Sequence, residues 1–412
     1  MVKEGYKKTK YGLIPDSWDF LQLKDIAKVN MGSSPPSSTY NEDGDGLPFF
    51  QGNAEFGSLY PEENQWCTDP QKVADKDNIL ISVRAPVGDI NIAPYRCCIG
   101  RGLAAIEGEE TSNKFIYYCL KQFNPKLQSY SQGSTFSSIN KKVLETFFVN
   151  YPPLPEQKKI ASILSSVDKS IEKTDEVIEE TKELKKGLMQ ELLTKGIGHS
   201  EFKDTILGKI PAKWDIKKLR DICNKVTDGT HDTPKEVNDG YPFITAKNIT
   251  NGKLDFEDCG YVSEKDHKKI ISRSKPEKGD ILFTHIGTIG QTVEVNVDFE
   301  FSIKNVALFK PNNELIKSKY FKYSLQSNIV QGFIKRILQG GVQQYLGLTT
   351  LRGFNIPVPP LEEQKKIASI LSSVDAKIQK EEEYKAKLEK LKKGLMQKLL
   401  TGKIRVNTEM EV

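Results

Sequence analysis

The chain has 412 residues and a formal net charge of +5, and 28% of its residues are charged against 37% hydrophobic. That length allows two or three domains with cores of their own. No apolar run approaches the roughly 18 residues that a membrane-spanning helix needs, so we expect no membrane partner. So small a positive balance does not by itself indicate nucleic acid, because a DNA-binding chain of this charge must gather its positive side chains locally.

The cysteines and the N-terminal segment indicate a cytoplasmic protein. The six cysteines include no CxxC pair and no disulfide framework spacing, which favours free thiols in a reducing compartment. The segment MVKEGYKKTKYG has no apolar stretch after its lysines, so it does not look like a secretory signal. We therefore expect the chain in the cytoplasm.

Residues 1–152 are expected to form a first globular domain of the α+β class. Short apolar runs such as NILISV and FFVNYP are bounded by Gly, Pro, Asn and Asp, a pattern typical of strands joined by turns. Helical patterns cover Ser112–Gln122 and, in the second half of the chain, Leu315–Ile337. The domain is thus predicted to mix strands, loops and a helix.

Residues 153–198 are expected to form a long helix and the linker after it. The stretch EQKKIASILSSVD begins at Glu156, and apolar residues follow it at alternating steps of four and three, at Ile160, Leu164, Val167 and Ile171, and later at Ile178. This spacing is that of a coiled-coil seam. About forty residues would make a rod of about 60 Å.

Residues 199–359 are expected to form a second globular domain on the plan of the first. GKIPAKWDIKKLRDI, from Gly208, matches GLIPDSWDFLQLKDI, from Gly12, and DILFTHIGTIGQT resembles NILISVRAPVGDI. The matched tryptophans, Trp18 and Trp214, are expected to be core anchors. The chain is therefore a tandem duplication of two units, which predicts a pseudo-two-fold molecule and not a solenoid.

Residues 360–412 are expected to form the second long helix and a tail, because EQKKIASILSSVD recurs there letter for letter. The middle of each seam is polar, with Thr174 and Thr181 in one helix and Glu381 and Lys385 in the other. Antiparallel pairing would bring these polar middles together and let the apolar end of each helix meet that of the other. We therefore expect an antiparallel coiled coil, although the pattern alone does not exclude parallel packing.

No constellation that would carry catalysis is found in the sequence. There is no GxxxxGK[ST] phosphate loop, no GxGxxG after a strand and no HExxH, and the histidines and cysteines have no metal-ligand spacing. NYPPL, at Asn150, resembles the Asn-Pro-Pro-aromatic loop of amino-methyltransferases only superficially, since the order differs and the second copy reads IPVPP. A polyproline entry to the helix is the simpler interpretation, and we expect no active site and no metal.

Polar loops at matching places in both halves supply the residue types that contact DNA. Arg, Lys, Asn, Gln, Ser and Thr read base edges, while Lys, Arg, hydroxyls and backbone amides bind phosphates. The candidate DNA-binding residues are Gln51, Asn53, Ser82, Arg84, Ser134, Ser137, Lys141, Lys142, Lys247, Asn248, Arg273, Lys275, Thr284, His285, Gln343 and Gln344. Taken singly, such loops are usually solvated turns. Arg84 could equally be a structural salt-bridge partner, and His285 could be ordinary variation within a strand.

The duplicated segments PPLPEQKKIASILSSVD and PPLEEQKKIASILSSVD, the KKGLMQ that follows each, and GLIPDSW and NILISVRAPVG upstream resemble the specificity subunit of type I restriction–modification systems. The resemblance covers essentially the whole chain. It implies two target-recognition domains, each reading one half of a split double-stranded DNA target, and two antiparallel spacer helices that set the unread gap. It also implies a chain without an active site or cofactor of its own.

The same resemblance implies partner subunits. Two modification subunits would dock on the helices, carry S-adenosylmethionine and methylate adenine, and restriction subunits would supply a motor and nuclease that use ATP and Mg. The candidate docking residues are Gln157, Lys158, Lys159, Gln190, Gln364, Lys365, Lys366 and Gln397. Two alternatives remain: a coiled-coil scaffold that never touches DNA, which the polar loops disfavour, and a self-contained methyltransferase, which the lack of a cofactor loop disfavours.

Overall fold

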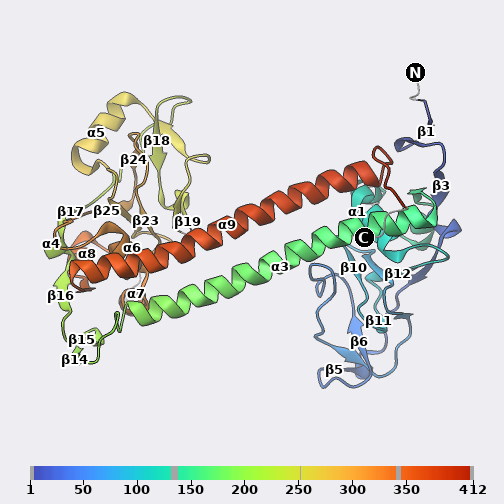
Figure 1. Cartoon of the computed structure of the whole chain (residues 1–412), viewed down its shortest axis with the longest axis horizontal. Helices are drawn as coiled ribbons and strands as arrows, with labels where there is room; N and C mark the ends of the chain where they lie inside the picture. The colour runs from blue at the N-terminus through green and yellow to red at the C-terminus, as the bar shows by residue number, and fades with distance from the viewer. Residues whose placement is uncertain (1–3, 131–137, 251, 340–344, 409–412) are drawn as a thin grey trace. The chain divides into compact units, whose positions relative to one another are not determined.

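Two compact units make up the chain in the computed structural model, which describes residues 4–130, 138–250, 252–339 and 345–408. One unit contains Met1–Asp175 and Glu383–Val412, and the other contains Glu176–Glu382. Each unit combines one globular part with one half of each of two long helices, α3 (Leu154–Leu192) and α9 (Leu361–Leu399) (Figure 1). The expected α+β class is confirmed.

The globular part of the first unit consists of short strands and two helices in its described residues. The helices are α1 (Asn113–Ser129) and α2 (Lys141–Glu145), with 3-10 turns at Leu23–Asp25 and Ser37–Thr39. The strands are β1 (Tyr6–Thr9), β2 (Gly12–Pro15), β3 (Asp19–Gln22), β4 (Ala27–Met31), β5 (Tyr40–Asn41), β6 (Leu47–Phe50), β7 (Trp66–Cys67), β8 (Val73–Ala74), β9 (Ile79–Ser82), β10 (Ile90–Ile92), β11 (Cys97–Ile99), β12 (Leu103–Gly108) and β13 (Phe148–Tyr151).

Two sheets organise this part of the first unit. Strands β10, β9, β12 and β4 pair antiparallel in that order, and the second sheet has the order β5-β7-β6-β11-β8 with β11 parallel to β6. Ile79 and Ile81 of β9 share one buried cluster with Phe115 and Leu120 of α1. One face of the first sheet is therefore covered by α1, and NILISV forms a strand as predicted.

The second unit has its own set of strands and short helices. The helices are α4 (Leu219–Ile222), α5 (Glu264–Ser274), α6 (Ser318–Gln326), α7 (Asn328–Gln339) and α8 (Leu348–Arg352), with a 3-10 turn at Ala246–Asn248. The strands are β14 (Phe202–Thr205), β15 (Gly208–Pro211), β16 (Asp215–Lys218), β17 (Cys223–Asp228), β18 (Tyr241–Ile244), β19 (Ile249–Thr250), β20 (Lys253–Leu254), β21 (Gly260–Val262), β22 (Ile281–Thr284), β23 (Thr292–Glu294), β24 (Ser302–Ile303), β25 (Val306–Pro311) and β26 (Asn355–Val358).

The strand pairing of the second unit repeats that of the first. Strands β17, β25, β22 and β23 pair antiparallel in that order, as β4, β12, β9 and β10 do, and β24 runs parallel to β18 as β11 runs parallel to β6. Trp18 and Trp214 are fully buried in the two cores, as predicted. The duplication seen in the sequence therefore extends to the sheet topology.

One predicted helix is divided in the structure. The pattern over Leu315–Ile337 predicted a single helix, but α6 ends at Gln326 and α7 begins at Asn328. Between them Ser327 has an extended backbone, and its hydroxyl accepts a hydrogen bond from the Val330 amide at 3.4 Å. A serine at this place competes for the backbone amides of the next turn and starts a new helix.

Within each unit α3 and α9 run antiparallel, as expected. In the first unit Asp168 pairs with Lys392, and Asp175 lies 2.6 Å from Lys385. In the second unit Asp375 lies 2.7 Å from Lys185. Early residues of one helix thus face late residues of the other. None of the helices in the described ranges is long and apolar enough to cross a bilayer, and all six cysteines are free thiols.

Candidate nucleic-acid interface

The turn after β9 carries two of the predicted DNA-binding residues. Ser82 is 1% exposed; its hydroxyl donates to the Pro86 carbonyl at 2.8 Å and accepts from the Asp89 amide at 2.9 Å. Arg84 is exposed on the same turn, and its backbone pairs with Ser138. Ser82 therefore holds the shape of the turn, whereas the guanidinium of Arg84 is open to solvent.

Gln51 and Asn53 lie half-buried in the loop after β6. The Gln51 amide donates to the Ser34 hydroxyl at 2.9 Å, and the Asn53 amide donates to the Asp89 carboxylate at 2.6 Å. The second bond ties this loop to the turn that presents Arg84. The structure thus brings together two side chains that lie 36 residues apart in the sequence.

Lys141 and Lys142 open the short helix α2. The Asn140 side chain accepts a hydrogen bond from the Val143 amide at 3.0 Å and caps this helix. Both lysines are exposed, and Lys141 lies 3.5 Å from Glu145. Their positive charges are therefore available to a phosphate backbone at the cost of one exposed ion pair.

In the second unit the turn after β22 corresponds to the turn after β9, but it carries different side chains. Thr284 is fully buried, and its hydroxyl accepts a hydrogen bond from the Gln291 amide at 3.0 Å. His285 is 3% exposed and donates from Nδ1 to the Leu346 carbonyl at 2.9 Å. Burial lowers the pKa of His285, which keeps the ring neutral. Both side chains are buried and bind backbone groups of neighbouring segments. They could contact DNA only if this turn changed its conformation.

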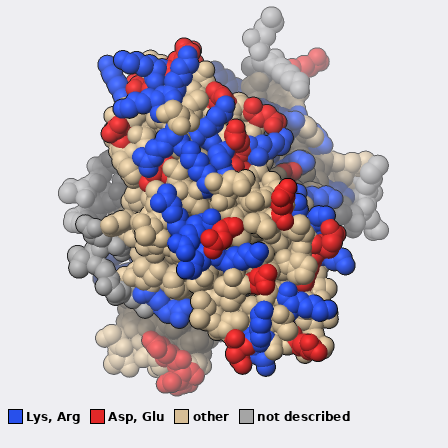
Figure 2. All heavy atoms as spheres, turned by 90° about the vertical axis from the view of Figure 1, so that its left-hand side faces the viewer, with Lys and Arg blue, Asp and Glu red and all other residues tan. Residues whose placement is uncertain are grey.

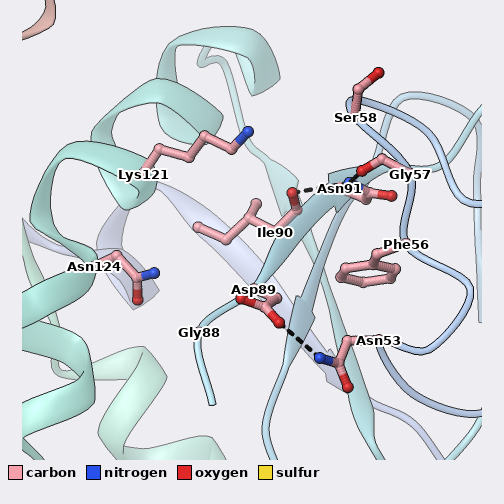
Figure 3. Close-up of a pocket in the computed structure, with 10 residues that line it drawn as sticks. All are labelled: Asn53, Phe56, Gly57, Ser58, Gly88, Asp89, Ile90, Asn91, Lys121 and Asn124. Atoms are coloured by element: carbon pink, nitrogen blue, oxygen red, sulfur yellow. Dashed lines mark hydrogen bonds between the residues drawn. The ribbon is translucent and has the colours of Figure 1, made fainter. Parts of the chain in front are cut away.

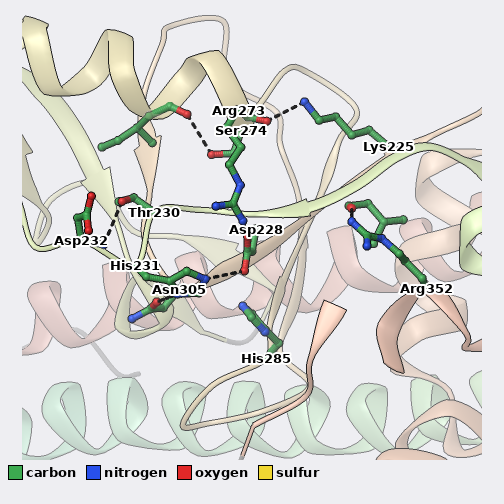
Figure 4. Close-up of polar contacts among 12 residues, drawn as sticks. Lys225, Asp228, Thr230, His231, Asp232, Arg273, Ser274, His285, Asn305 and Arg352 are labelled. Atoms are coloured by element: carbon green, nitrogen blue, oxygen red, sulfur yellow. Dashed lines mark hydrogen bonds and ion pairs between the residues drawn. The ribbon is translucent and has the colours of Figure 1, made fainter. Parts of the chain in front are cut away.

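A buried carboxylate organises the polar end of β17 (Figure 4). Asp228 is 3% exposed, forms an ion pair with the exposed Arg273 and lies 3.0 Å from Nε2 of His231. Nδ1 of His231 lies 2.8 Å from Asn305 Oδ1. Figure 4 shows His285 on the opposite side of Asp228 from Arg273. The described residues contain no group of His, Cys, Asp or Glu that could hold a metal ion.

Sequence reasoning found Arg273 but missed Asp228 and His231. An acidic residue at the end of a strand is ordinarily exposed, and nothing in the segment VTDGTHDT, in which Asp228 is the first aspartate, shows that this side chain is buried. Its burial follows from packing of α5 over the strand end, which joins residues about 45 positions apart, Asp228 and Arg273. Such a long-range pair leaves no periodic signal in the sequence.

The remaining DNA-binding candidates also divide into side chains that reach solvent and side chains that are buried in a turn. Lys247 is exposed, but Asn248 is buried, and its side chain accepts from the Thr245 amide at 3.0 Å and donates to the Asp258 carbonyl at 2.8 Å. Lys275 pairs with Glu300 at the surface. Asn248 thus caps a turn, Lys247 keeps an exposed charge, and Lys275 is half-buried and paired with Glu300. Four further candidates lie outside the described residues: Ser134, Ser137, Gln343 and Gln344.

Two of the predicted docking residues need correction. Gln157 and Gln364 have no exposed surface. Their amides donate to the carbonyls of Pro152 and Pro359, and their side-chain oxygens accept from the amides of Ser112 and Lys317. These glutamines therefore anchor each long helix to its own globular part. Exposed members of the set are Lys158, Lys365, Lys366, Gln190 and Gln397, and Lys159 is half-buried.

Positive side chains gather on one face of the second unit. Figure 2 shows Lys and Arg spread over the face that is turned to the viewer, with fewer Asp and Glu between them. From β15 to β17 five basic residues are exposed against two acidic ones: the basic residues are Lys209, Lys213, Lys218, Arg220 and Lys225, and the acidic ones are Asp215 and Asp221. A chain with a net charge of only +5 thus has a local concentration of positive charge, which binding to DNA requires.

Comparison with known proteins identifies the family. The family model described as "Type I restriction modification DNA specificity domain" matches residues 15–183 and again 211–390. The chain belongs to this family. Its two matches coincide with the two halves of the duplication, and the predicted resemblance is confirmed.

Similar proteins that are named as type I specificity subunits support this membership. The type I restriction enzyme MjaVIII specificity subunit of Methanocaldococcus jannaschii is 27% identical over 98% of this chain and 97% of its own length. The putative MjaX specificity subunit of the same organism is 46% identical, but that match spans 46% of each chain. A crystal structure of the type I restriction–modification S subunit from M. genitalium superposes with a TM-score of 0.64 at 19% identity, covering 93% of this chain and 96% of that one.

Family membership settles the class of protein. Specificity subunits are DNA-recognition proteins of restriction–modification complexes and carry no catalysis of their own, so the expectation of a non-enzyme is confirmed. A scaffold that never meets DNA and a self-contained methyltransferase both disagree with this membership.

Proposed function

We propose that each globular part of this specificity subunit reads one half of a bipartite double-stranded DNA target. The paired helices α3 and α9 set the unread gap between the half-sites, and two modification subunits dock on them. S-adenosylmethionine, ATP and Mg are bound by the modification and restriction subunits and not by this chain. The complex works in the cytoplasm.

The observation that carries this proposal is the repetition of one contact set at both helix pairs. The Tyr118 hydroxyl donates to Asp168 at 2.6 Å, and the Tyr323 hydroxyl donates to Asp375 at 2.6 Å. Trp18 and Trp214 likewise each donate to a glutamate at the start of a long helix, at 3.0 Å. Two copies of one partner require two equivalent surfaces, which explains why this part of the chain is repeated so faithfully.

The loops of the two units differ, whereas EQKKIASILSSVD and KKGLMQ of the long helices are repeated. The first unit presents Arg84 on the turn after β9, whereas the second presents Arg273 beside Asp228 at the end of β17. Two unlike half-sites require two unlike sets of base-reading side chains. We assign base contacts to these exposed arginines. We assign phosphate contacts to the exposed Lys141, Lys142 and Lys247 and to the half-buried Lys275.

Mapping of methylated sites in DNA from cells that carry the intact system tests this function. We expect modified adenines in a sequence of two defined halves separated by a fixed gap. The affinity of the chain with its modification subunits for that duplex should fall steeply with salt, because phosphate contacts release counterions. A target with a single undivided half, or binding to random duplexes with no preference, would count against the proposal.

A further inference from the structure

Four loops of the first unit meet just beyond the ends of β4, β6, β9 and β11. The loop after β11 is bonded to the other three. Its Gly102 amide donates to the Gln51 carbonyl at 3.1 Å, and the Gly102 carbonyl accepts from the Val83 amide at 2.8 Å. The Arg101 amide donates to the Ser34 hydroxyl at 3.3 Å. The loop after β11 therefore lies between the two loops that carry the candidate DNA contacts after β6 and β9.

A tight turn in this loop presents the Arg101 side chain. The Leu103 amide donates to the Gly100 carbonyl at 3.0 Å and closes the turn around Arg101 and Gly102. A Cβ atom at Gly102 would lie 2.6 Å from the Gln51 carbonyl oxygen, so this close approach requires glycine. The backbone of the turn is thus packed against its neighbour, while the Arg101 side chain is exposed.

Arg101 and Arg84 bring two uncompensated positive charges to this place. Each is one residue away from the hydrogen bond that joins the loops after β9 and β11, and both side chains are exposed. Within the described ranges no carboxylate lies at ion-pair distance from either guanidinium. The carboxylate of the turn that carries Arg84 belongs to Asp89, and it is bonded to the Asn53 amide at 2.6 Å (Figure 3). Both guanidinium groups are therefore available to a partner that offers acceptors.

The second unit joins the corresponding loops with different side chains. Strand β24 runs parallel to β18 as β11 runs parallel to β6, and a short connection leads from β24 to β25 as one leads from β11 to β12. Asn305 lies in that connection, and its Oδ1 lies 2.8 Å from Nδ1 of His231 in the loop after β17. Asn305 and His231 thus take the places of Arg101 and Ser34. The position is kept and its chemistry is changed, as two readers of unlike half-sites require.

We propose that Arg101 is a specificity-determining residue whose guanidinium reads a guanine in the half-site of the first unit, beside the contact assigned to Arg84. The paired N–H donors of a guanidinium match the O6 and N7 acceptors that guanine presents in the major groove. The rigid turn fixes the point from which the side chain reaches the base. This inference rests on the DNA-reading function proposed above and adds a residue that the search of the sequence did not select.

Competition binding by the chain together with its modification subunits tests Arg101→Gln. The competing duplexes carry each single base-pair substitution in both halves of the mapped target. The half-site of the first unit is the half that persists when Gly208–Asn355 is exchanged for the equivalent part of another family member. We expect the variant to lose roughly tenfold or more of its discrimination at one G·C pair of that half, and none in the other half.

Arg96→Gln is the matched control. Arg96 is also exposed and lies 3.5 Å from Asp75, but it precedes β11, whereas Arg101 follows that strand. It therefore lies at the opposite end of the strand from the four loops. Arg96→Gln should leave affinity and discrimination unchanged. Both variants should keep the Tm of the unchanged chain, because neither side chain belongs to the core.

Two outcomes would overturn the inference. If Arg101→Gln weakened binding equally for all duplexes and reduced the slope of log affinity against log salt by about one, Arg101 would bind phosphate and not a base. If discrimination stayed as in the unchanged chain, Arg101 would contact no base. In both cases a bipartite target of the unchanged chain would leave the proposed function standing, whereas an unchanged chain with no preference for any duplex would overturn both.

Discussion

At the residue scale, one aspartate joins the globular part of each unit to the helix pair. In the second unit Asp375 accepts from the Tyr323 hydroxyl at 2.6 Å and from Lys185 at 2.7 Å. Burial opposes ionisation of Asp375, but the hydrogen bonds from Lys185 and Tyr323 outweigh it and lower its pKa. The stabilisation this gives is therefore present above the ordinary aspartate pKa and is lost as the pH falls through the lowered value.

Asp375→Asn should lower the free energy of unfolding of the full chain by about 1–2 kcal/mol at pH 7, a range discounted for partial solvent exposure. The difference from the unchanged chain should shrink as the pH is lowered below about 4, where the unfolded carboxylate begins to bind protons. Urea unfolding at several pH values measures this. Glu180→Gln, at an exposed site on α3, should change stability by less than about 0.5 kcal/mol. A loss that does not vary with pH would contradict the assignment.

Asp228→Asn should alter the reading of one half-site. The buried carboxylate holds the Arg273 guanidinium and the His231 ring in place, and an oriented guanidinium discriminates between bases by about 1–3 kcal/mol. Competition binding with duplexes mutated in each half should show relaxed selectivity of roughly tenfold or more in one half only. Asp232→Asn, an exposed neighbour that lies 3.4 Å from Lys269, is the matched control. If both variants had equal effects, the result would show that only the overall charge matters and that Asp228 does not orient Arg273 for base reading.

Residue type in the sequence identifies which side chains can contact DNA but not which of them are exposed. Arg84 and Lys247 are exposed, whereas Ser82, Asn248 and His285 belong to the same chemical classes and are buried as turn and cap residues. The difference arises from tight turns whose hydroxyl and amide groups satisfy backbone donors. Residue type alone therefore does not predict whether such a side chain is exposed or buried.

At the element scale, the two long helices were predicted well because their signal is local. Apolar residues at coiled-coil spacing recur over several turns, and EQKKIASILSSVD and KKGLMQ repeat letter for letter in the two copies. Their polar middles also predicted antiparallel pairing. The break at Ser327 was missed because a single serine hydroxyl caps the start of α7, and the apolar spacing runs on through it.

Deleting seven residues from the middle of both α3 and α9 should change the gap between the half-sites. Seven residues shorten a helix by about 10 Å, which is about three base pairs at about 3.4 Å each. Methylation mapping of the shortened system should give a gap shorter by about that number, or no modification if the half-sites lose their phase. Glu180→Gln, which keeps the length, should leave the gap as it was. An unchanged gap after the double deletion would remove the spacing role.

At the scale of the whole molecule, the two units share one construction and differ in their loops. Both units have the same strand order in their four-stranded sheets, the same tryptophan–glutamate bond and the same tyrosine–aspartate–lysine contact. They differ in the loops that carry arginine, lysine and amide side chains. The sequence revealed the duplication and the family, but the specific bases read depend on loop conformation and DNA shape, which no residue pattern specifies.

Exchange of residues Gly208–Asn355 for the equivalent part of another family member, followed by methylation mapping, tests modular reading most directly. One half of the recognised sequence should change while the other half and the gap stay the same, because the first unit and both helices are untouched. A map in which both halves change, or in which neither changes, would contradict independent reading by two domains.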